Sequence, residues 1–234
     1  GVDPLNGEIL AMIGERLILD EPNGEFNRVT NAQRQPGSSF KPIIYATAIE
    51  QGGYTQADVV VDEAVSFPQP NQPNWEPDNH DNTFIGARTL REHLNISRNI
   101  PLVKLVEAVT PEAVAARSQS LGYATVQPFL SIALGSFEVT PLQHASAMGA
   151  FMNGGVHVEP HIISRVEDVE GNVLWEPQPR ETQVWTEQTA YIMLDLLRAN
   201  VADGGAFSRR AQVGEHWIGG KTGTTNDDRD IWFV

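Results

Sequence analysis

The chain has 234 residues, of which 41% are hydrophobic and 20% charged, so it is expected to be globular with a buried core. Acidic residues exceed basic ones by 30 to 16, and the net charge of −14 argues against a nucleic-acid-binding protein and against docking on an anionic membrane. The lack of cysteine excludes disulfides, thiolate metal sites and thiol nucleophiles. Only three of the 16 basic residues are lysines, namely Lys41, Lys104 and Lys221.

The first part of the chain predicts a hairpin and a helix. Turn-forming residues at 3–7 precede an apolar run at 8–13, which predicts a buried strand. A helix is expected over residues 38–51, because Pro42 fits its first turn and Gly52-Gly53 is a stop signal. Apolar side chains lie on most of its faces, so this helix should be buried.

The next part combines a loop with two helices. Residues 66–83 are rich in proline and asparagine and predict a long irregular segment, a feature that is often functional. The acidic pair Asp62-Glu63 before it is interpreted as part of a solvent-exposed loop. Thr89 can cap a short helix over residues 90–94, and the apolar run at 100–109 predicts another helix.

The second half alternates helices and hairpins. Thr110-Pro111 and Thr140-Pro141 each combine an N-cap with a proline at the first helical position. A hairpin is expected over residues 162–176, and a long helix capped by Thr186 should reach about residue 201. Strands are expected at 216–218 and 230–234, with a turn at 226–229. This mixture of helices with sequence-adjacent antiparallel strands indicates the α+β class.

Three short motifs carry candidate chemistry, and two of the three lysines lie in them. The first, Ser-x-x-Lys, places Ser38 and Lys41 on one helix face, where a lysine of lowered pKa can activate the serine. The helix N-terminus also favours negative charge near the backbone N–H of Ser38, as an oxyanion hole requires. The second motif is Ser-x-Asn at residues 97–99, which offers a hydroxyl for proton transfer and an amide for a peptide group.

The third motif, Lys-Thr-Gly at residues 221–223, suits a strand along such a site. Thr222 and Thr224 would point to one side and offer two hydroxyls, and Lys221 would add a positive charge. Gly223 would let a ligand approach the backbone closely. Together these residues predict an edge that binds a carboxylate.

The three motifs and their flanks resemble the transpeptidase domain of bifunctional (class A) penicillin-binding proteins, in the serine DD-peptidase/β-lactamase-like superfamily. The resemblance covers residues 1–234 and implies an antiparallel β-sheet flanked by helices on both sides. It also implies a partial domain, truncated at both ends, without the first strand, the last strands and the C-terminal helix. One departure is Gly204-Gly205-Ala206, where the family usually has a threonine in the middle. The flanking segments that carry the resemblance are Arg34-Gln35-Pro36-Gly37, Ile100-Pro101, Ala133-Leu134-Gly135 and Thr224-Thr225-Asn226.

The resemblance implies a mechanism. Ser38 would attack the D-Ala–D-Ala amide of a peptidoglycan stem peptide, with Lys41 accepting its proton directly or through Ser97. The backbone N–H groups of Ser38 and Thr224 would form the oxyanion hole. Asn99 would bind the peptide amide, and Lys221, Thr222, Gly223 and Thr224 would hold the terminal carboxylate. β-Lactams would acylate the same serine. The implied location is the outer face of the bacterial cytoplasmic membrane, with an anchor outside this chain.

Other functions are weighed against this one. A DD-carboxypeptidase or a β-lactam sensor of the same fold would share the motifs. A class A β-lactamase needs Glu-x-x-x-Asn, and no glutamate between Ser97 and Lys221 has asparagine four residues on. A P-loop nucleotide-binding protein would need glycine where Glu215 stands. The six histidines are scattered and are assigned structural or surface roles, so neither a metal nor a cofactor is expected.

Overall fold

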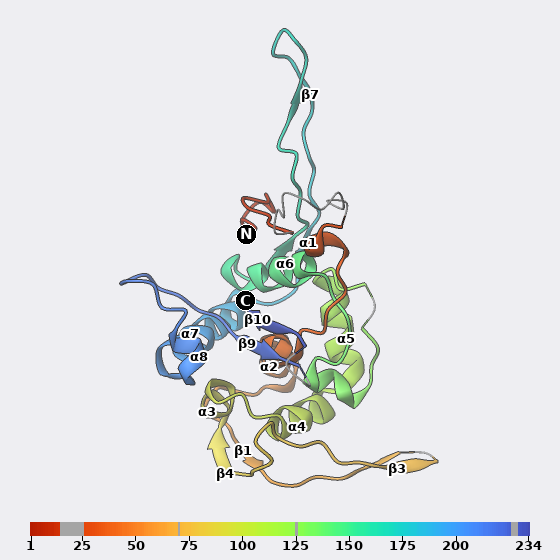
Figure 1. Cartoon of the computed structure of the whole chain (residues 1–234), viewed down its shortest axis with the longest axis vertical. Coiled ribbons are helices and arrows are strands. Elements are labelled where there is room, and N and C mark those ends of the chain that lie inside the picture. Colours follow the sequence, from red (N-terminus) through yellow and green to blue (C-terminus); the bar gives the residue numbers. More distant parts are fainter. Residues whose placement is uncertain (15–25, 70, 125, 226–228) are drawn as a thin grey trace, which may run out of the picture.

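The computed structural model describes residues 1–14, 26–69, 71–124, 126–225 and 229–234 (Figure 1). Short helices and strands alternate along the described chain. The helices are α1 (Arg28–Asn31), η1 (Gly37–Phe40, 3-10), α2 (Lys41–Gly52), α3 (Leu90–Asn95), α4 (Ile100–Val109), α5 (Pro111–Ser120), η2 (Leu130–Leu134, 3-10), α6 (Pro141–Met152), α7 (Glu187–Asp203) and α8 (Ala206–Arg209). The strands are β1 (Val59–Asp62), β2 (Phe67–Gln69), β3 (Gln72–Trp75), β4 (Gly86–Thr89), β5 (Val156–Val158), β6 (Val166–Glu167), β7 (Val173–Trp175), β8 (Glu181–Gln183), β9 (Thr222–Thr224) and β10 (Ile231–Phe233).

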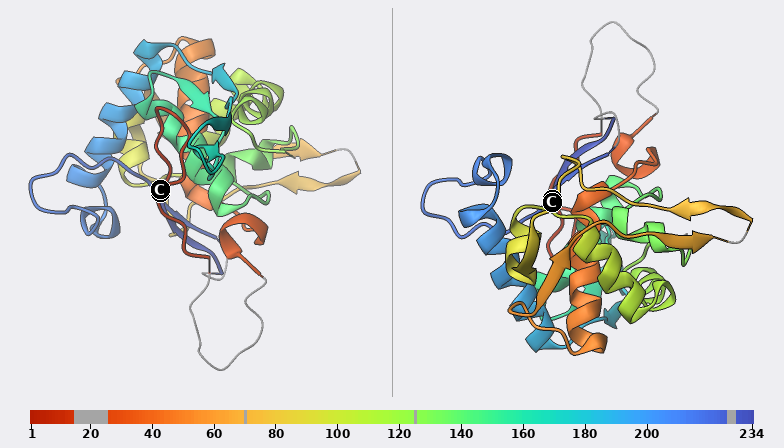
Figure 2. Two further views of the ribbon diagram at one scale, coloured as in Figure 1. Left: turned by 90° about the horizontal axis from the view of Figure 1, so that it is seen from above. Right: turned by 90° about the horizontal axis from the view of Figure 1, so that it is seen from below.

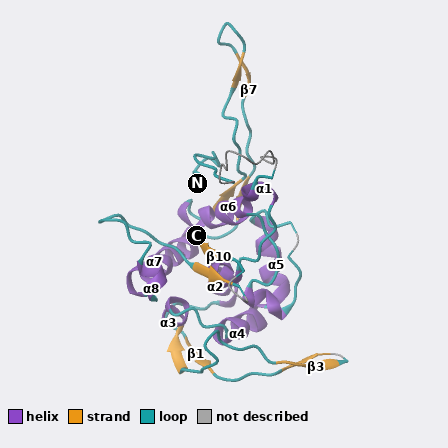
Figure 3. Ribbon diagram, in the orientation of Figure 1, coloured by secondary structure: helices purple, strands orange, loops and turns teal. Residues whose placement is uncertain are grey.

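Helices form the body of the molecule, and α2 is its core (Figure 3). This helix packs against α4, α5 and α7, and its side chains from Lys41 to Ala48 are buried on all sides. It ends where Gly53 adopts a φ of 67°, a left-handed conformation that favours glycine. The predicted buried helix is therefore confirmed, with a short 3-10 turn, η1, in front of it.

The helix caps expected from the sequence are present. Thr89 and Thr140 each accept a hydrogen bond from the third residue of their helix, whose side chain returns the bond in a capping box. Thr110 and Thr186 cap α5 and α7 with their hydroxyls. These caps satisfy N–H groups that a helix start leaves free, which explains why the predicted helix starts are correct.

The described strands form five separate antiparallel pairs: β1 with β4, β2 with β3, β5 with β8, β6 with β7, and β9 with β10. The α+β class with antiparallel pairing is confirmed. The hairpin β6–β7 and the ribbon β2–β3 extend away from the helical body (Figure 1), and the ribbon is also seen extending in Figure 2. No helix in the described part of the chain is long and apolar enough to cross a membrane.

Three local predictions were wrong. Part of the segment expected to be irregular is the ribbon β2–β3, where Pro68 is tolerated because a two-stranded ribbon has free outer edges. The strand expected at 8–13 makes only isolated bridges, and Ile13 in it is 86% exposed. Residues 216–218 form no strand, and Trp217 is exposed under the guanidinium of Arg198. Residues 226–228 of the expected turn lie outside the described residues.

Candidate active site

Ser38 lies in η1, at the point where the chain enters α2, and β9 packs directly against this turn. A Cβ atom at Gly223 would lie 2.5 Å from the Pro36 carbonyl oxygen and 2.9 Å from the Ser39 Cβ. One at Gly37 would lie 2.6 Å from the Thr224 carbonyl oxygen. Glycine was expected at position 223 for a ligand, but on this face the space is filled by η1 itself. The two glycines thus bring the first and third motifs together.

Lys41 is fully buried and reaches the second motif. Its Nζ donates to Ser97 O at 2.6 Å, to Arg98 O at 2.9 Å and to Asn99 Oδ1 at 2.7 Å. Three acceptors match the three N–H donors of an ammonium group. Among the described residues, the Ser38 hydroxyl makes no hydrogen bond. The expected contact between Ser38 and Lys41 is therefore not formed as a hydrogen bond in this structure. Catalytic hydrogen bonds often tighten only when substrate binds.

Ser97 joins the two lysines. Its Oγ lies 3.3 Å from Lys41 Nζ and accepts a hydrogen bond from Lys221 Nζ at 2.9 Å. The residue has a φ of 60°, a left-handed conformation that is costly for a residue other than glycine, asparagine or aspartate. This turn between α3 and α4 points both the carbonyl and the hydroxyl of Ser97 at Lys41. One hydroxyl therefore links the lysines of the first and third motifs.

Both lysines have lowered pKa values. Burial lowers the pKa of Lys41 well below its ordinary value, and the charges of Lys221 and then Arg98 lower it further. Burial lowers the pKa of Lys221 to about 8. A lysine loses its proton more readily when water is excluded and other cations are near. The lowered pKa makes the neutral amine of Lys41, which can accept a proton, more accessible than that of an ordinary lysine.

The register of β9 on β10 orients its backbone toward the site. Lys221 and Val234 exchange two hydrogen bonds of 2.8 and 3.1 Å, and Thr225 N–H donates to Asp230 O at 3.1 Å. Bonded pairs alternate along an antiparallel ladder, so Thr224 lies in a non-bonded position and its N–H points away from β10, on the side of η1. The N–H of Ser38, at the start of η1, has no intrahelical acceptor. These are the two donors expected for the oxyanion hole.

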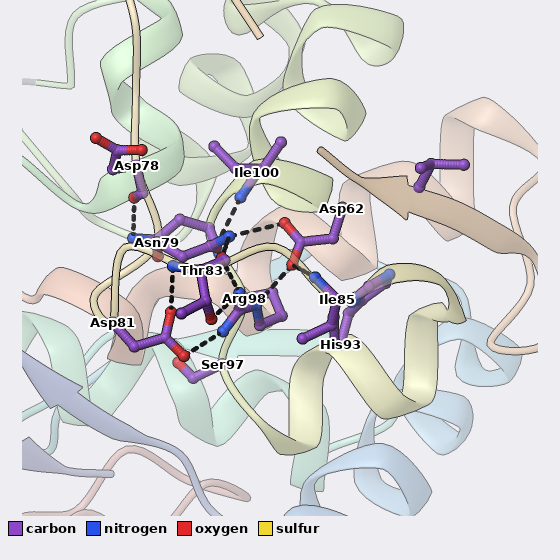
Figure 4. Close-up of polar contacts among 12 residues, drawn as sticks. Asp62, Asp78, Asn79, Asp81, Thr83, Ile85, His93, Ser97, Arg98 and Ile100 are labelled. Carbon is purple, nitrogen blue, oxygen red and sulfur yellow. Dashed lines mark hydrogen bonds and ion pairs between the residues drawn. The ribbon is translucent and has the colours of Figure 1, made fainter. Parts of the chain in front are cut away.

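A charged network supports the second motif (Figure 4). Arg98 is buried, and its Nε donates to Asp62 Oδ2 at 2.8 Å while its Nη1 donates to Asp81 Oδ2 at 2.9 Å. The same guanidinium also donates to Thr83 O. Asn79 Nδ2 donates to Asp62 Oδ1 at 2.7 Å. We call these five residues the arginine cluster.

The arginine cluster fixes the backbone of Asn99. The N–H of Asn99 donates to Asn79 Oδ1 at 2.8 Å, and its side-chain Nδ2 donates to Asp78 O at 2.9 Å. The side-chain amide of Asn99 thus bridges Lys41 on one side and the loop between β3 and β4 on the other. Part of the segment expected to be a functional loop is therefore a support for the second motif (Figure 4).

The acidic pair at 62–63 was interpreted as solvated, which is wrong for one of its members. Asp62 is 1% exposed and binds Arg98. Glu63 is exposed and pairs with Lys104 at 2.8 Å, away from the three motifs. One side chain is buried and the other exposed because successive residues at the end of a strand point to opposite sides.

Comparison with known proteins places this geometry in a family. Residues 2–230 match the family model described as "Penicillin binding protein transpeptidase domain". The chain belongs to this family. Penicillin-binding protein 1A of Aquifex aeolicus is 38% identical over 234 residues, which are 100% of this chain and 31% of that protein. The expected membership in the transpeptidase domains of class A penicillin-binding proteins is confirmed.

Solved structures of penicillin-binding proteins share the fold. Penicillin-binding protein 1A from Haemophilus influenzae superposes with a TM-score of 0.89 at 28% identity, over 99% of this chain and 40% of that one. The D,D-transpeptidase domain of a peptidoglycan glycosyltransferase from Eggerthella lenta gives 0.84 at 21% identity, over 100% and 67%. The chain spans about a third of the length of the curated relatives it matches.

The structure brings the predicted site residues of this penicillin-binding protein domain together at one place, with Ser97 at the centre of their contacts. The sequence did not point to the groups that support them. Asp62, Asn79 and His144 belong to no motif, and each has a hydrogen-bond partner at least 17 residues away along the chain. No spacing pattern links such residues, so only the fold reveals them.

Proposed function

We propose that the chain is a serine DD-transpeptidase domain that cross-links peptidoglycan stem peptides. The observation that carries this proposal is the meeting of Lys41 and Lys221 at the hydroxyl of Ser97. A base of lowered pKa, a proton-transferring hydroxyl and a buried cation are what acyl transfer to a serine from an anionic peptide terminus requires.

The proposed reaction has two steps. Ser38 Oγ attacks the carbonyl between the two D-Ala residues, its proton passes to Lys41, and the oxyanion binds the N–H groups of Ser38 and Thr224. The C–N bond then breaks, and the terminal D-Ala leaves with a proton delivered through Ser97. In the second step an amine of a neighbouring strand attacks the acyl-enzyme, Ser38 regains its proton, and a cross-link forms.

The substrate contacts are proposed on the same basis. Lys221, Thr222 and Thr224 lie on or beside the strand facing the nucleophile, where they would bind the terminal carboxylate, and Gly223 keeps that strand against η1. Asn99 would bind the peptide amide. β-Lactams, which carry a carboxylate beside a reactive amide, would acylate Ser38 in the same way.

The wider setting follows from the proposed substrate. Stem peptides are cross-linked outside the cytoplasmic membrane, so we place this domain on that side, in a membrane-anchored parent protein that is also a glycosyltransferase. The chain itself covers only the transpeptidase part of such a protein.

Labelling with a fluorescent penicillin tests the proposal. We expect one covalent adduct, located at Ser38 by mass spectrometry, and no labelling of Ser38→Ala. Ser120→Ala, which changes an exposed serine on α5, is the matched control and should label fully. A Ser38→Ala protein that still labels would refute the assignment.

A second assay separates the related functions. Release of D-Ala from a stem peptide should be accompanied by a cross-linked product when an amine acceptor is added. Hydrolysis alone would indicate a carboxypeptidase, and labelling without any turnover would indicate a β-lactam sensor.

A further inference from the structure

A run of hydrogen bonds lies beneath the nucleophile turn. Tyr123, after α5, contacts His144 of α6 through its hydroxyl, at 2.7 Å from Nδ1. Nε2 of His144 lies 2.8 Å from Ser39 Oγ, which in turn donates to Pro36 O at 2.6 Å. The three side chains are buried. We call Tyr123, His144 and Ser39 the histidine cluster.

The hydrogen bonds of the histidine cluster can run in one direction only. A carbonyl oxygen cannot donate, so the single proton of the Ser39 hydroxyl lies on its bond to Pro36 O. Ser39 Oγ must then accept from His144, which places a proton on Nε2. In a neutral imidazole the other nitrogen accepts, so Nδ1 takes the proton of the Tyr123 hydroxyl. Burial lowers the pKa of His144 to about 3, which keeps the ring in this neutral form.

The last hydrogen bond of this run joins Ser39 to Pro36, the residues that flank the segment Gly37-Ser38. Pro36 O accepts from the Ser39 hydroxyl and also from the Ser39 N–H at 3.2 Å, so the turn 36–39 is closed around the nucleophile. The same two residues are the ones that a Cβ at Gly223 would strike. The hydrogen bond that fixes Ser39 therefore also affects the distance between η1 and β9.

His144 touches the other side of the site as well. Its ring packs edge-to-face on Trp232, with centroids 5.3 Å apart. Trp232 pairs with Gly223 across the β10–β9 ladder, and its indole N–H donates to Gln35 O at 2.8 Å. The imidazole is thus in contact with the turn that carries the nucleophile and with the neighbour of the carboxylate-binding strand.

We propose that His144 is a positioning residue for acylation, which holds Ser38 and the oxyanion donors of η1 and β9 at their working distance. It does so as a neutral N–H donor to Ser39 and takes no part in proton transfer to the substrate. This inference rests on the proposed function, because it concerns the rate at which Ser38 is acylated.

The test measures acylation of the full chain by a fluorescent penicillin over a range of concentrations. This separates the rate constant at saturation from the binding constant of the non-covalent complex. His144→Leu should lower the rate constant by about 10- to 100-fold, because a displacement near 1 Å has effects of that size. The binding constant should change less than threefold. His144→Gln, which can offer an N–H to Ser39, should recover most of the rate.

A matched control is a second buried histidine that contacts the same helix. His157 lies on β5 and binds Ser146 of α6 at 2.9 Å, and none of its hydrogen bonds among the described residues reaches η1. His157→Leu should keep the acylation rate constant while removing a comparable buried hydrogen bond. Ser39→Ala keeps His144 and removes its acceptor, and should lower the rate constant as His144→Leu does.

Three outcomes would overturn the inference: an unchanged rate constant in Ser39→Ala, an equal loss in His157→Leu, or no recovery in His144→Gln. If His144→Leu does not fold, Ser39→Ala and His144→Gln decide the question. Failure of the proposed function is distinguishable, since the unmodified protein would then not be labelled at Ser38 at all.

Discussion

The turn that carries Ser38 and the turn that carries Ser97 each rest on a buried polar cluster, but the two clusters differ in charge. The histidine cluster is a single directed run of neutral hydrogen bonds that ends on Pro36 O. The arginine cluster contains two ion pairs, from Arg98 to Asp62 and to Asp81, and a hydrogen bond to the loop between β3 and β4. Both are assembled from residues far apart in the sequence.

The difference matches what each turn has to do. In the proposed mechanism Ser38 is the nucleophile and needs a fixed position, which a neutral cluster supplies without adding to the local electric field. The second motif borders Lys41, the proposed proton acceptor, and the charge of Arg98 contributes to lowering the pKa of Lys41. One cluster therefore acts by geometry alone, and the other by geometry and by charge.

Removing Arg98 should have the largest effect on stability. Arg98→Met leaves the carboxylate of Asp62 buried without its cation, which is expected to cost about 3–5 kcal/mol of unfolding free energy. Denaturant unfolding measures the loss. Adding Asp62→Asn to the same protein should recover much of this loss, because the buried carboxylate that lacked its cation is then removed as well. A midpoint equal to that of the unmodified protein would show that the cluster is not a charged support.

Lys221→Met should change how stability depends on pH. The folded protein has a Lys221 pKa of about 8 against an ordinary 10.5, so the unfolded chain binds the extra proton first as pH falls. Stability should therefore drop by about 3 kcal/mol between pH 10.5 and 8, and the variant should lack this part of the slope. Thermal unfolding across this range is the measurement.

The same variant should lose acylation by β-lactams that carry a carboxylate, by roughly 10- to 100-fold, since one hydrogen bond to a charged group is removed. Lys104→Met is the control, because Lys104 binds Glu63 away from the site. A Lys221→Met protein that is less stable at every pH and keeps its acylation rate would mean that Lys221 is structural.

Tyr123→Phe should have a smaller effect, about 1–2 kcal/mol of unfolding free energy, because it leaves Nδ1 of His144 buried without a donor. Tyr45→Phe is the matched control. Its hydroxyl is buried in α2 and, among the described residues, has no hydrogen-bond partner, so its removal should be neutral or stabilising. Equal losses in the two variants would show that the cost comes from removing a buried hydroxyl as such and not from losing its hydrogen bond to His144.

The residues of these two clusters could not be predicted from the sequence, whereas several local features could. Helix starts were predictable because Thr89, Thr110, Thr140 and Thr186 act through N–H groups only two or three residues away. The motif residues were predictable because their types and order resemble a family. His144 and Asp62 were assigned surface or structural roles, since the value of a buried polar residue depends on partners that only the fold supplies.

The hairpin expected at 162–176 and the strand expected at 230–234 are present as β6–β7 and β10, but two other strand predictions failed for a related physical reason. An apolar run such as 8–13 becomes a buried strand only where a partner strand covers it, and in the described residues it makes single bridges to Val2 and His161. The ribbon β2–β3 was missed because proline normally argues against a strand, and its prolines are allowed only at an edge. Pairing is a property of the whole sheet, whereas a helix cap is local.

The smallest effect is expected at the rim of the arginine cluster. Asp81 is about half exposed, and its hydrogen bond to Arg98 lowers its pKa to about 2. Its contribution is therefore present above pH 4 and is lost as the pH falls through 2. Because solvent screens this pair, Asp81→Asn should cost at most about 0.5 kcal/mol at neutral pH, a small fraction of the cost of Arg98→Met. Denaturant unfolding of both variants under one set of conditions compares them. Equal costs would mean that Arg98 is held by its exposed partner, and the arginine cluster would then resemble a surface salt bridge more than a buried support.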